Sequence, residues 1–184
     1  MAATPSNMLA LGTIAPDFNL PEPLTGKNVS LGDIHSDKAT VVMFICNHCP
    51  FVIHVNEELV RLGNDYKSKG ISFVAISSND VVNYPQDGPE KMAEHTKKVG
   101  YPFPYLYDET QEIARDYQAA CTPDLYVFDK DLKLVYRGQL DDSRPGNGIE
   151  VTGKDLRAAL DAVLAGDQVN PEQTPSIGCN IKWK

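Results

Sequence analysis

Two of the four cysteines in the sequence lie three residues apart, at the point where an apolar run ends and a helical pattern begins. Cys46 and Cys49 follow the apolar residues 40–45, and Pro50 comes directly after Cys49. A thiolate is the form of cysteine that attacks disulfides and peroxides, and a second thiol then releases the product by thiol–disulfide exchange. This spacing therefore indicates a redox-active thiol at a strand-to-helix turn.

Cys49 is the favoured nucleophile because it stands at the start of the predicted helix. Pro50 suits the first helical position, where its missing N–H costs nothing, and this places Cys49 at the N-cap. A helix N-terminus offers unpaired N–H groups and about half a positive charge, which stabilise a thiolate. A protonated His48 would add to this effect. Cys46 lies at the strand end, upstream of the helix dipole, so its thiol should be less acidic.

The sequence leaves open which thiol resolves the intermediate that Cys49 forms. Cys46 is close enough along the chain to close a small disulfide with it. Cys179 lies on the C-terminal segment and reaches the site if that segment docks on the domain. Cys121 carries the least weight, because core packing is the simpler explanation for it.

The same side chains are suitable ligand types for zinc, which cysteine and histidine commonly bind. The candidate ligands are Cys46, His48, Cys49 and Cys179. A second paired motif at the usual spacing is missing, and a thiolate at a helix N-cap is better placed for chemistry. We therefore predict neither a bound metal nor an organic cofactor.

Alternating strand and helix patterns surround the thiol pair and predict an α/β fold with a central, mostly parallel sheet covered by helices on both faces. Apolar β-branched runs predict buried strands, and apolar residues three or four apart predict helices. The expected strands are an N-terminal β-hairpin over 15–31 and the segments 40–45, 71–77, 103–106, 125–128 and 132–137. The expected helices run from Pro50 to Gly70, from Pro89 to Gly100, over a short stretch after an Asp108/Gln111 capping box, and from the cap Thr152 to Gly166.

These elements predict one domain over residues 1–184, with a core at about 12–165 and a C-terminal tail at 167–184. Residues 1–15 read as a loose lead-in, and residues 78–88 as a long polar loop. The tail contains the apolar residues Ile181 and Trp183. We therefore expect it to dock on the core, with Trp183 as the candidate anchor.

Composition excludes several classes of function. The chain has 184 residues and a formal net charge of −8, which argues against a nucleic-acid surface. It lacks an apolar run of about 18 residues, so we expect no membrane span. Residues 1–11 contain no Lys or Arg and no long apolar stretch, unlike a secretory signal. We expect a cytoplasmic protein whose cysteines are mostly reduced.

Three separate stretches of the sequence match the pattern of one known fold. The first combines Gly12-Thr13-Ile14-Ala15-Pro16-Asp17-Phe18 with residues 26–31, the second is the strand–cysteine–helix unit, and the third is the Thr122-Pro123 strand over 121–129. Together they resemble the thioredoxin-like fold, in the peroxiredoxin-like branch formed by the alkyl hydroperoxide reductase/thiol-specific antioxidant (AhpC/TSA) group. The resemblance covers roughly residues 12–165. It implies a central mixed sheet flanked by helices.

The resemblance also implies a cis peptide bond at Pro123, facing the active thiol. An X-Pro bond tolerates the cis form far better than other peptide bonds do. We expect such a turn to leave the backbone of Thr122 exposed beside Cys49, where a substrate segment could pair with it.

The motif Cys46-Asn47-His48-Cys49-Pro50 and the tail segment 177–183 further resemble a subgroup described as thioredoxin-like or thiol-disulfide isomerase-like proteins. Peroxiredoxins carry threonine three residues before the peroxidatic cysteine, and here Cys46 stands at that position. The resulting site residues are the catalytic Cys49, Cys46 and Cys179, with substrate contacts from His48, Pro50, Thr122 and Pro123.

These residues and the resemblance predict a thiol–disulfide oxidoreductase in which a second cysteine resolves a mixed disulfide. The alternatives are a thiol peroxidase that reduces hydroperoxides and a redox-inert binding domain of the same fold. The expected partners are a protein or small-molecule disulfide or peroxide, and a thiol electron donor such as the thioredoxin or glutathione system. We expect neither nucleic acid nor membrane as a partner.

Overall fold

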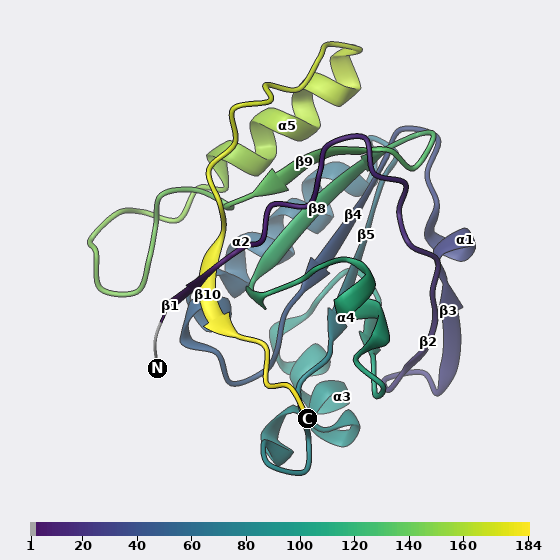
Figure 1. The fold of residues 1–184 in the computed structure, drawn as a ribbon, viewed down its shortest axis with the longest axis vertical. Helices are drawn as coiled ribbons and strands as arrows, with labels where there is room; N and C mark the ends of the chain where they lie inside the picture. Colours follow the sequence, from purple (N-terminus) through teal and green to yellow (C-terminus); the bar gives the residue numbers. More distant parts are fainter. Residues whose placement is uncertain (1–2) are drawn as a thin grey trace.

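The computed structural model describes residues 3–184, and in this range five strands form the central sheet in the order β6-β5-β4-β8-β9. Strand β4 lies in the middle, parallel to β5 and antiparallel to β8. β6 extends the parallel side. β9 extends the antiparallel side, next to β8 in Figure 1. The predicted α/β fold with a mixed sheet is therefore confirmed, but the expectation of a mostly parallel sheet is wrong, because β4 pairs antiparallel with β8 and β8 with β9.

Strands and helices alternate along most of the chain. The strands are β1 (Ala3–Pro5), β2 (Asn19–Glu22), β3 (Lys27–Ser30), β4 (Ala39–Phe44), β5 (Ile71–Ser77), β6 (Tyr105–Tyr107), β7 (Cys121–Thr122), β8 (Asp124–Asp129), β9 (Leu134–Gly138) and β10 (Ile177–Asn180). The helices are α1 (Leu31–Ile34), α2 (Pro50–Lys67), α3 (Pro89–Val99), α4 (Glu112–Asp116) and α5 (Lys154–Ala165), with a 3₁₀ helix η1 (Pro85–Asp87). Among residues 3–184, the helices are too short or too polar to cross a membrane.

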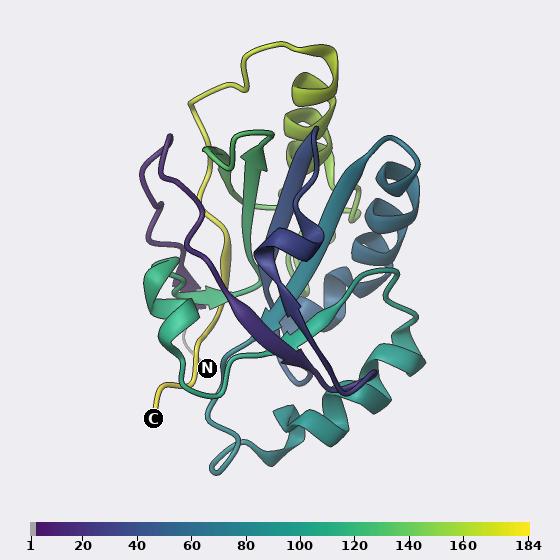
Figure 2. The same cartoon turned by 90° about the vertical axis from the view of Figure 1, so that its right-hand side faces the viewer.

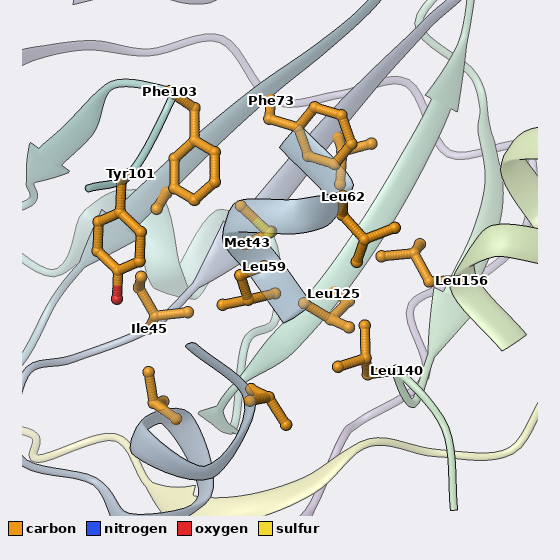
Figure 3. Packing of buried hydrophobic residues seen from close by; sticks show 14 of the residues in the cluster. Met43, Ile45, Leu59, Leu62, Phe73, Tyr101, Phe103, Leu125, Leu140 and Leu156 are labelled. Carbon is orange, nitrogen blue, oxygen red and sulfur yellow. The ribbon is translucent and has the colours of Figure 1, made fainter. Parts of the chain in front are cut away.

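One face of the sheet carries the larger core, which fixes α2 in place. Met43 of β4 and Ile45, the residue after the end of β4, point to this face, where Leu59 and Leu62 of α2 pack on them and Leu156 of α5 lies alongside (Figure 3). Burial of these apolar side chains is the main favourable term that holds α2 on the sheet. The start of α2, and Cys49 with it, is therefore set relative to the end of β4.

The opposite face of the sheet carries a second core. Val42 and Phe44 alternate with Met43 along β4 and pack there with Phe18, and with Tyr117 just after α4. Figure 2 shows the β2–β3 hairpin and α4 on the side of the sheet away from α2 and α5. A strand whose alternate side chains enter two cores is apolar throughout, which explains the unbroken apolar run before Cys46.

The predicted N-terminal hairpin is present as β2 and β3, which pair antiparallel with Asn19 opposite Ser30. Its first strand begins at Asn19 rather than near residue 15. The short helix α1, which the sequence analysis did not predict, follows at once. Ser30 caps it, because its side chain accepts the N–H of Asp33 while Asp33 accepts the N–H of Ser30.

The C-terminal tail docks on the domain, as predicted. Its strand β10 lies between β1 and β7 in a second, three-stranded sheet of the described residues, so β1 and β10 lie side by side (Figure 1). The prediction of a loose lead-in is therefore wrong for residues 3–5. Ile181 is the buried anchor of the tail at 1% exposed, whereas Trp183 is 41% exposed.

Two predicted helix caps are wrong. Helix α5 is preceded by Gly153 in the left-handed region (φ 68), and the buried carboxylate of Asp141 accepts the N–H groups of Thr152 and Gly153 at 2.7 and 2.6 Å. At α4, Gln111 is left-handed and makes no side-chain cap. Asp108 instead accepts the N–H of Ala114 at 3.0 Å. At α5 the carboxylate that binds the backbone, Asp141, lies outside the predicted cap. At α4 it is the predicted Asp108, which binds the N–H of Ala114 without Gln111 as its partner.

Candidate active site

Cys49 stands at the N-cap of α2, as the sequence predicted. Its φ of −67° and ψ of 122° are extended, and Pro50 opens the helix. The carbonyl oxygen of Cys49 accepts the N–H groups of Val52 and Ile53 at 3.0 and 2.9 Å. The thiol therefore sits where the first turn of the helix presents its N–H groups and the positive end of its dipole.

The register of β4 and β8 brings Cys46 next to the turn before β8. Phe44, the last residue of β4, pairs with Asp124, the first residue of β8. The residues that follow β4 therefore lie beside those that precede β8, which include Thr122. Cys46 Sγ lies 3.5 Å from Thr122 Oγ1, and the bond between Thr122 and Pro123 is cis, as expected. Cys46 and Thr122, which are 76 residues apart in the sequence, thus form one wall of the site.

Strand β10 brings a third thiol to the same place. Cys179 pairs with Thr122 across β10 and β7. Cys49 Sγ lies 2.6 Å from Cys179 Sγ and 3.3 Å from the carbonyl oxygen of Thr122. All three thiols are free and buried. The prediction of an exposed Thr122 backbone is wrong, because β10 covers it and Thr122 is 3% exposed.

The three thiols differ strongly in acidity. A hydrogen bond from Cys46 is the largest cause that lowers the pKa of Cys49, to about 4, and it outweighs the opposing effect of burial. Contacts with Cys179, Thr122 and the N–H of Val52 lower it further. Cys49 is therefore a thiolate at neutral pH, the state that attacks sulfur or peroxide oxygen.

The two partner thiols stay protonated at neutral pH. The hydrogen bond with Cys49 raises the pKa of Cys46 well above its ordinary value, and burial and the negative charge of Asp87 add to this. Burial raises the pKa of Cys179 to about 12, and its contact with the Cys49 thiolate contributes. Each partner is thus a thiol donor to a single anionic sulfur.

Cys121, the fourth cysteine, contacts backbone carbonyl groups rather than another thiol. Its Sγ lies 3.6 Å from the carbonyl oxygen of Pro123 and 4.0 Å from that of Ser176. Burial raises the pKa of Cys121 far above its ordinary value, and the charge of Asp124 adds to this. Its surroundings are those of a packed core side chain.

His48 points to a carboxylate that the sequence analysis did not single out. His48 Nδ1 lies 2.5 Å from Asp87 Oδ2, and the imidazole stacks on Tyr84 with centroids 5.6 Å apart. Asp87 is fully buried and also accepts the N–H of Asn47 at 2.8 Å and the amide of Asn79 at 2.9 Å. It ties the segment predicted as a polar loop to the turn between the two cysteines.

No local pattern marks Asp87 as a site residue, because a Pro-Gln-Asp-Gly-Pro sequence reads as an exposed turn. Only the fold buries it. The available signal was weak: a buried turn needs a partner for the N–H groups that follow Cys46, and a nearby carboxylate can provide one.

Three possible metal-ligating groups also meet here. Ligand atoms of Cys46, His48 and Asp87 all lie within 4.8 Å of one another. This set shares Cys46 and His48 with the ligand set considered from the sequence but replaces Cys49 and Cys179 with Asp87. Both oxygens of Asp87 already accept N–H groups, from Asn47 and the His48 backbone on one and from the His48 ring and Asn79 on the other.

Comparison with known proteins identifies the family. Residues 11–137, more than half of the chain, match the model of the AhpC/TSA family. The chain belongs to the AhpC/TSA family. The match covers Cys46, Cys49 and the Thr122-Pro123 turn but ends before Cys179. No curated protein matches this chain.

Solved structures extend the likeness of this AhpC/TSA protein to its tail. A conserved uncharacterized protein from Geobacillus kaustophilus is 65% identical, with a TM-score of 0.99 over 100% of this chain and 97% of its own. A hypothetical protein from Sinorhizobium meliloti is 49% identical, with a TM-score of 0.96 over 98% of each chain. The thioredoxin domain of a thiol-disulfide oxidoreductase from Bacteroides vulgatus is 21% identical, with a TM-score of 0.60 over 70% of this chain and 88% of its own. The fold is thioredoxin-like, as predicted.

Proposed function

We propose that this protein is a thiol–disulfide oxidoreductase in which Cys49 is the nucleophile and Cys179 the resolving thiol. The observation that carries the proposal is the 2.6 Å contact between the sulfurs of Cys49 and Cys179. Membership of the AhpC/TSA family supports thiol chemistry in general. The low pKa of Cys49 supports its role as the attacking sulfur.

The reaction begins with attack of the Cys49 thiolate on one sulfur of a substrate disulfide. A bond forms between Cys49 and that sulfur, and the other substrate sulfur leaves as a thiolate that takes a proton. Cys179 then loses its proton and attacks Cys49 Sγ, which releases the second substrate thiol. The substrate is reduced by two electrons, and Cys49 and Cys179 are oxidised to a disulfide.

Cys46 has a different role in this scheme. Its thiol donates a hydrogen bond to Cys49 and stabilises the anion both before attack and when Cys49 is the leaving sulfur. An external thiol donor, of the kind that thioredoxin or glutathione systems supply, returns the disulfide to two thiols. The cytoplasm, which maintains such donors, is the compartment that fits this cycle.

A thiol peroxidase is the second candidate, and the burial of Cys49 favours it, since a hydroperoxide is small. Cys49 would attack the peroxide oxygen and become a sulfenic acid while the alcohol or water leaves. Cys179 would then condense with it, with loss of water. Stopped-flow oxidation by hydrogen peroxide separates the two candidates. Oxidation no faster than that of free cysteine removes the peroxidase.

Disulfide mapping tests the proposed pair directly. The protein is oxidised mildly, digested and analysed by mass spectrometry, with Cys49→Ser as the control. We expect a peptide linking Cys49 to Cys179. A chain in which Cys49 enters neither a disulfide nor a sulfenic adduct contradicts both enzymatic functions. Titration of every thiol near pH 8.5, the ordinary value, would favour the redox-inert binding domain.

A further inference from the structure

The backbone edge of β7 beside Cys49 is a surface for an extended strand, and the chain fills it with its own tail. Cys179 pairs with Thr122, and Asn180 with Cys121, in antiparallel register. A strand edge with unpaired N–H and C=O groups is a template for an extended peptide. Strand β10 therefore occupies the place beside Cys49 that a protein segment carrying a disulfide would take.

The fit between β10 and this edge depends on Gly178. A Cβ atom at this position would lie 1.9 Å from the carbonyl oxygen of Thr122. Ser176 Oγ donates to the carbonyl oxygen of Pro123 at 2.6 Å just before it. The tail is therefore matched to the backbone of Thr122 and Pro123 over several residues, not only at the cysteine.

Other contacts hold β10 in place on both sides. Its second edge pairs with β1, where Thr4 lies opposite Gly178. Beyond the strand, Ile181 is buried and donates its N–H to the carbonyl oxygen of Ala120 at 3.1 Å. The N–H of Lys182 donates to Asn79 Oδ1 at 2.9 Å. Removal of the whole strand breaks all of these contacts together.

Small and extended substrates therefore meet different barriers. Cys49 is 0% exposed and Cys179 is 2% exposed, so every substrate requires some opening. A small disulfide has no extended backbone to pair with the Thr122 edge, so its reaction does not need the strand position that β10 holds. A disulfide on an extended protein segment needs the Thr122 edge itself, and this requires release of β10 as a unit.

We propose that β10 restricts this protein to low-molecular-weight disulfides, by occupying the strand position that a protein-borne disulfide requires. The inference rests on the proposed role of Cys49 as nucleophile. Strand β10 would then have two roles: it carries the resolving thiol and it excludes extended substrates.

The test compares two activated disulfides with the same leaving group: the 2-pyridyl disulfide of cysteine, and that of a cysteine within a short unstructured peptide. The full chain carries Cys179→Ser, which keeps β10 in place but stops the reaction at the first step. Cys49 then forms a mixed disulfide with the cysteine sulfur and releases 2-thiopyridone, whose absorbance is followed. A chain with both Cys49→Ser and Cys179→Ser is the blank.

We expect the small disulfide to react about tenfold faster than the peptide or more, and addition of Gly178→Ala to raise the peptide rate about tenfold. Gly32→Ala is the matched control, because a Cβ atom there would lie 3.7 Å from Ser30 Oγ, an ordinary van der Waals contact. It should leave the ratio of the two rates unchanged. Equal rates for peptide and small disulfide in the Cys179→Ser chain overturn the proposal. So does a ratio that Gly178→Ala does not change.

If Gly178→Ala prevents folding, Ile181→Ala replaces it, because it loosens the tail without a clash in β10. Ile181→Ala should raise the rate with the peptide relative to the rate with the small disulfide, by a smaller factor than Gly178→Ala. An unchanged ratio of the two rates again overturns the proposal. Failure of the function itself is distinct: neither disulfide would then release 2-thiopyridone above the blank.

Discussion

The two thiols beside Cys49 belong to different regions and are held in different ways. Cys46 is three residues away, and the register of β4 with β8 holds it at Thr122 Oγ1. Cys179 is 130 residues away, and the pairing of β10 with β7 delivers it to within 2.6 Å of Cys49 Sγ. In the proposed mechanism Cys46 stabilises the thiolate of Cys49, and Cys179, whose sulfur lies 2.6 Å from Cys49 Sγ, resolves the mixed disulfide. Sequence proximity therefore does not decide which thiol resolves.

The largest expected effect is on Cys49, the residue that both Cys46 and Cys179 contact. Cys49→Ser should lower disulfide reduction by about a thousandfold or more, because the nucleophile is lost. Cys121→Ser is the control, with a loss below about threefold, since that thiol makes no contact with Cys49 in the proposed mechanism. Turnover of a small disulfide at pH 7 measures both. A comparable loss in the two variants would argue that core damage, not chemistry, is responsible.

The two partner thiols should differ in whether their loss traps the mixed disulfide on Cys49. Cys179→Ser should slow turnover by about a hundredfold and trap the mixed disulfide on Cys49. Cys46→Ser should not trap it, because a hydroxyl still donates to Cys49 and Cys179 still resolves. Intact-protein mass spectrometry after one turnover measures the trapped fraction. Accumulation in Cys46→Ser alone would assign resolution to Cys46.

Asp87 holds the turn that carries Cys46 and Cys49, and Asp87→Asn should destabilise the fold by about 2 kcal/mol, because buried N–H donors lose a charged acceptor. The Tm should fall by about 4–8 °C for a chain of this size. The control is Asp37→Asn, at an exposed position, which should leave the Tm nearly unchanged. Equal Tm values for the two variants contradict a structural role for Asp87.

The pH dependence of Cys49 reactivity tests the role of Cys46 as donor. The folded pKa of Cys49 lies below its ordinary value, at about 4, so its rate should stay flat as pH falls and drop only near pH 4. Cys46→Ala removes the donor, raises this pKa and should lower the rate at pH 5 by about tenfold, with little change at pH 8. Cys46→Ser is the matched control, and an identical profile for Ala and Ser refutes the donor role.

The smallest expected effect concerns the end of the tail. Arg115 lies 5.0 Å above the ring of Trp183, which is partly exposed. Trp183→Ala should cost about 0.5–1 kcal/mol, as expected for an exposed cation–π contact. Ile181→Ala should cost about 2–4 kcal/mol, because it empties a buried site. Denaturant unfolding compares them, and a larger loss for Trp183→Ala would restore it as the anchor.

Local patterns in the sequence were sufficient for the central unit of the site. The apolar run of β4 and the helical spacing of α2 are set by residues close in the chain, and Pro50 marks the helix start. Cys49 at the N-cap follows from these alone. The cap of α5 was not predictable in the same way, because the carboxylate of Asp141, 11 residues before Thr152, binds the backbone there.

The sequence by itself determined the fold class and the strand-to-helix turn with Cys49 at the helix N-cap, because each depends on local periodicity and on one proline. Only the tertiary structure decided that Cys179 reaches Cys49, that Asp87 binds the turn, and that β10 covers Thr122. These contacts join segments far apart in the chain through strand register and burial. No local pattern in the sequence predicts where such segments meet.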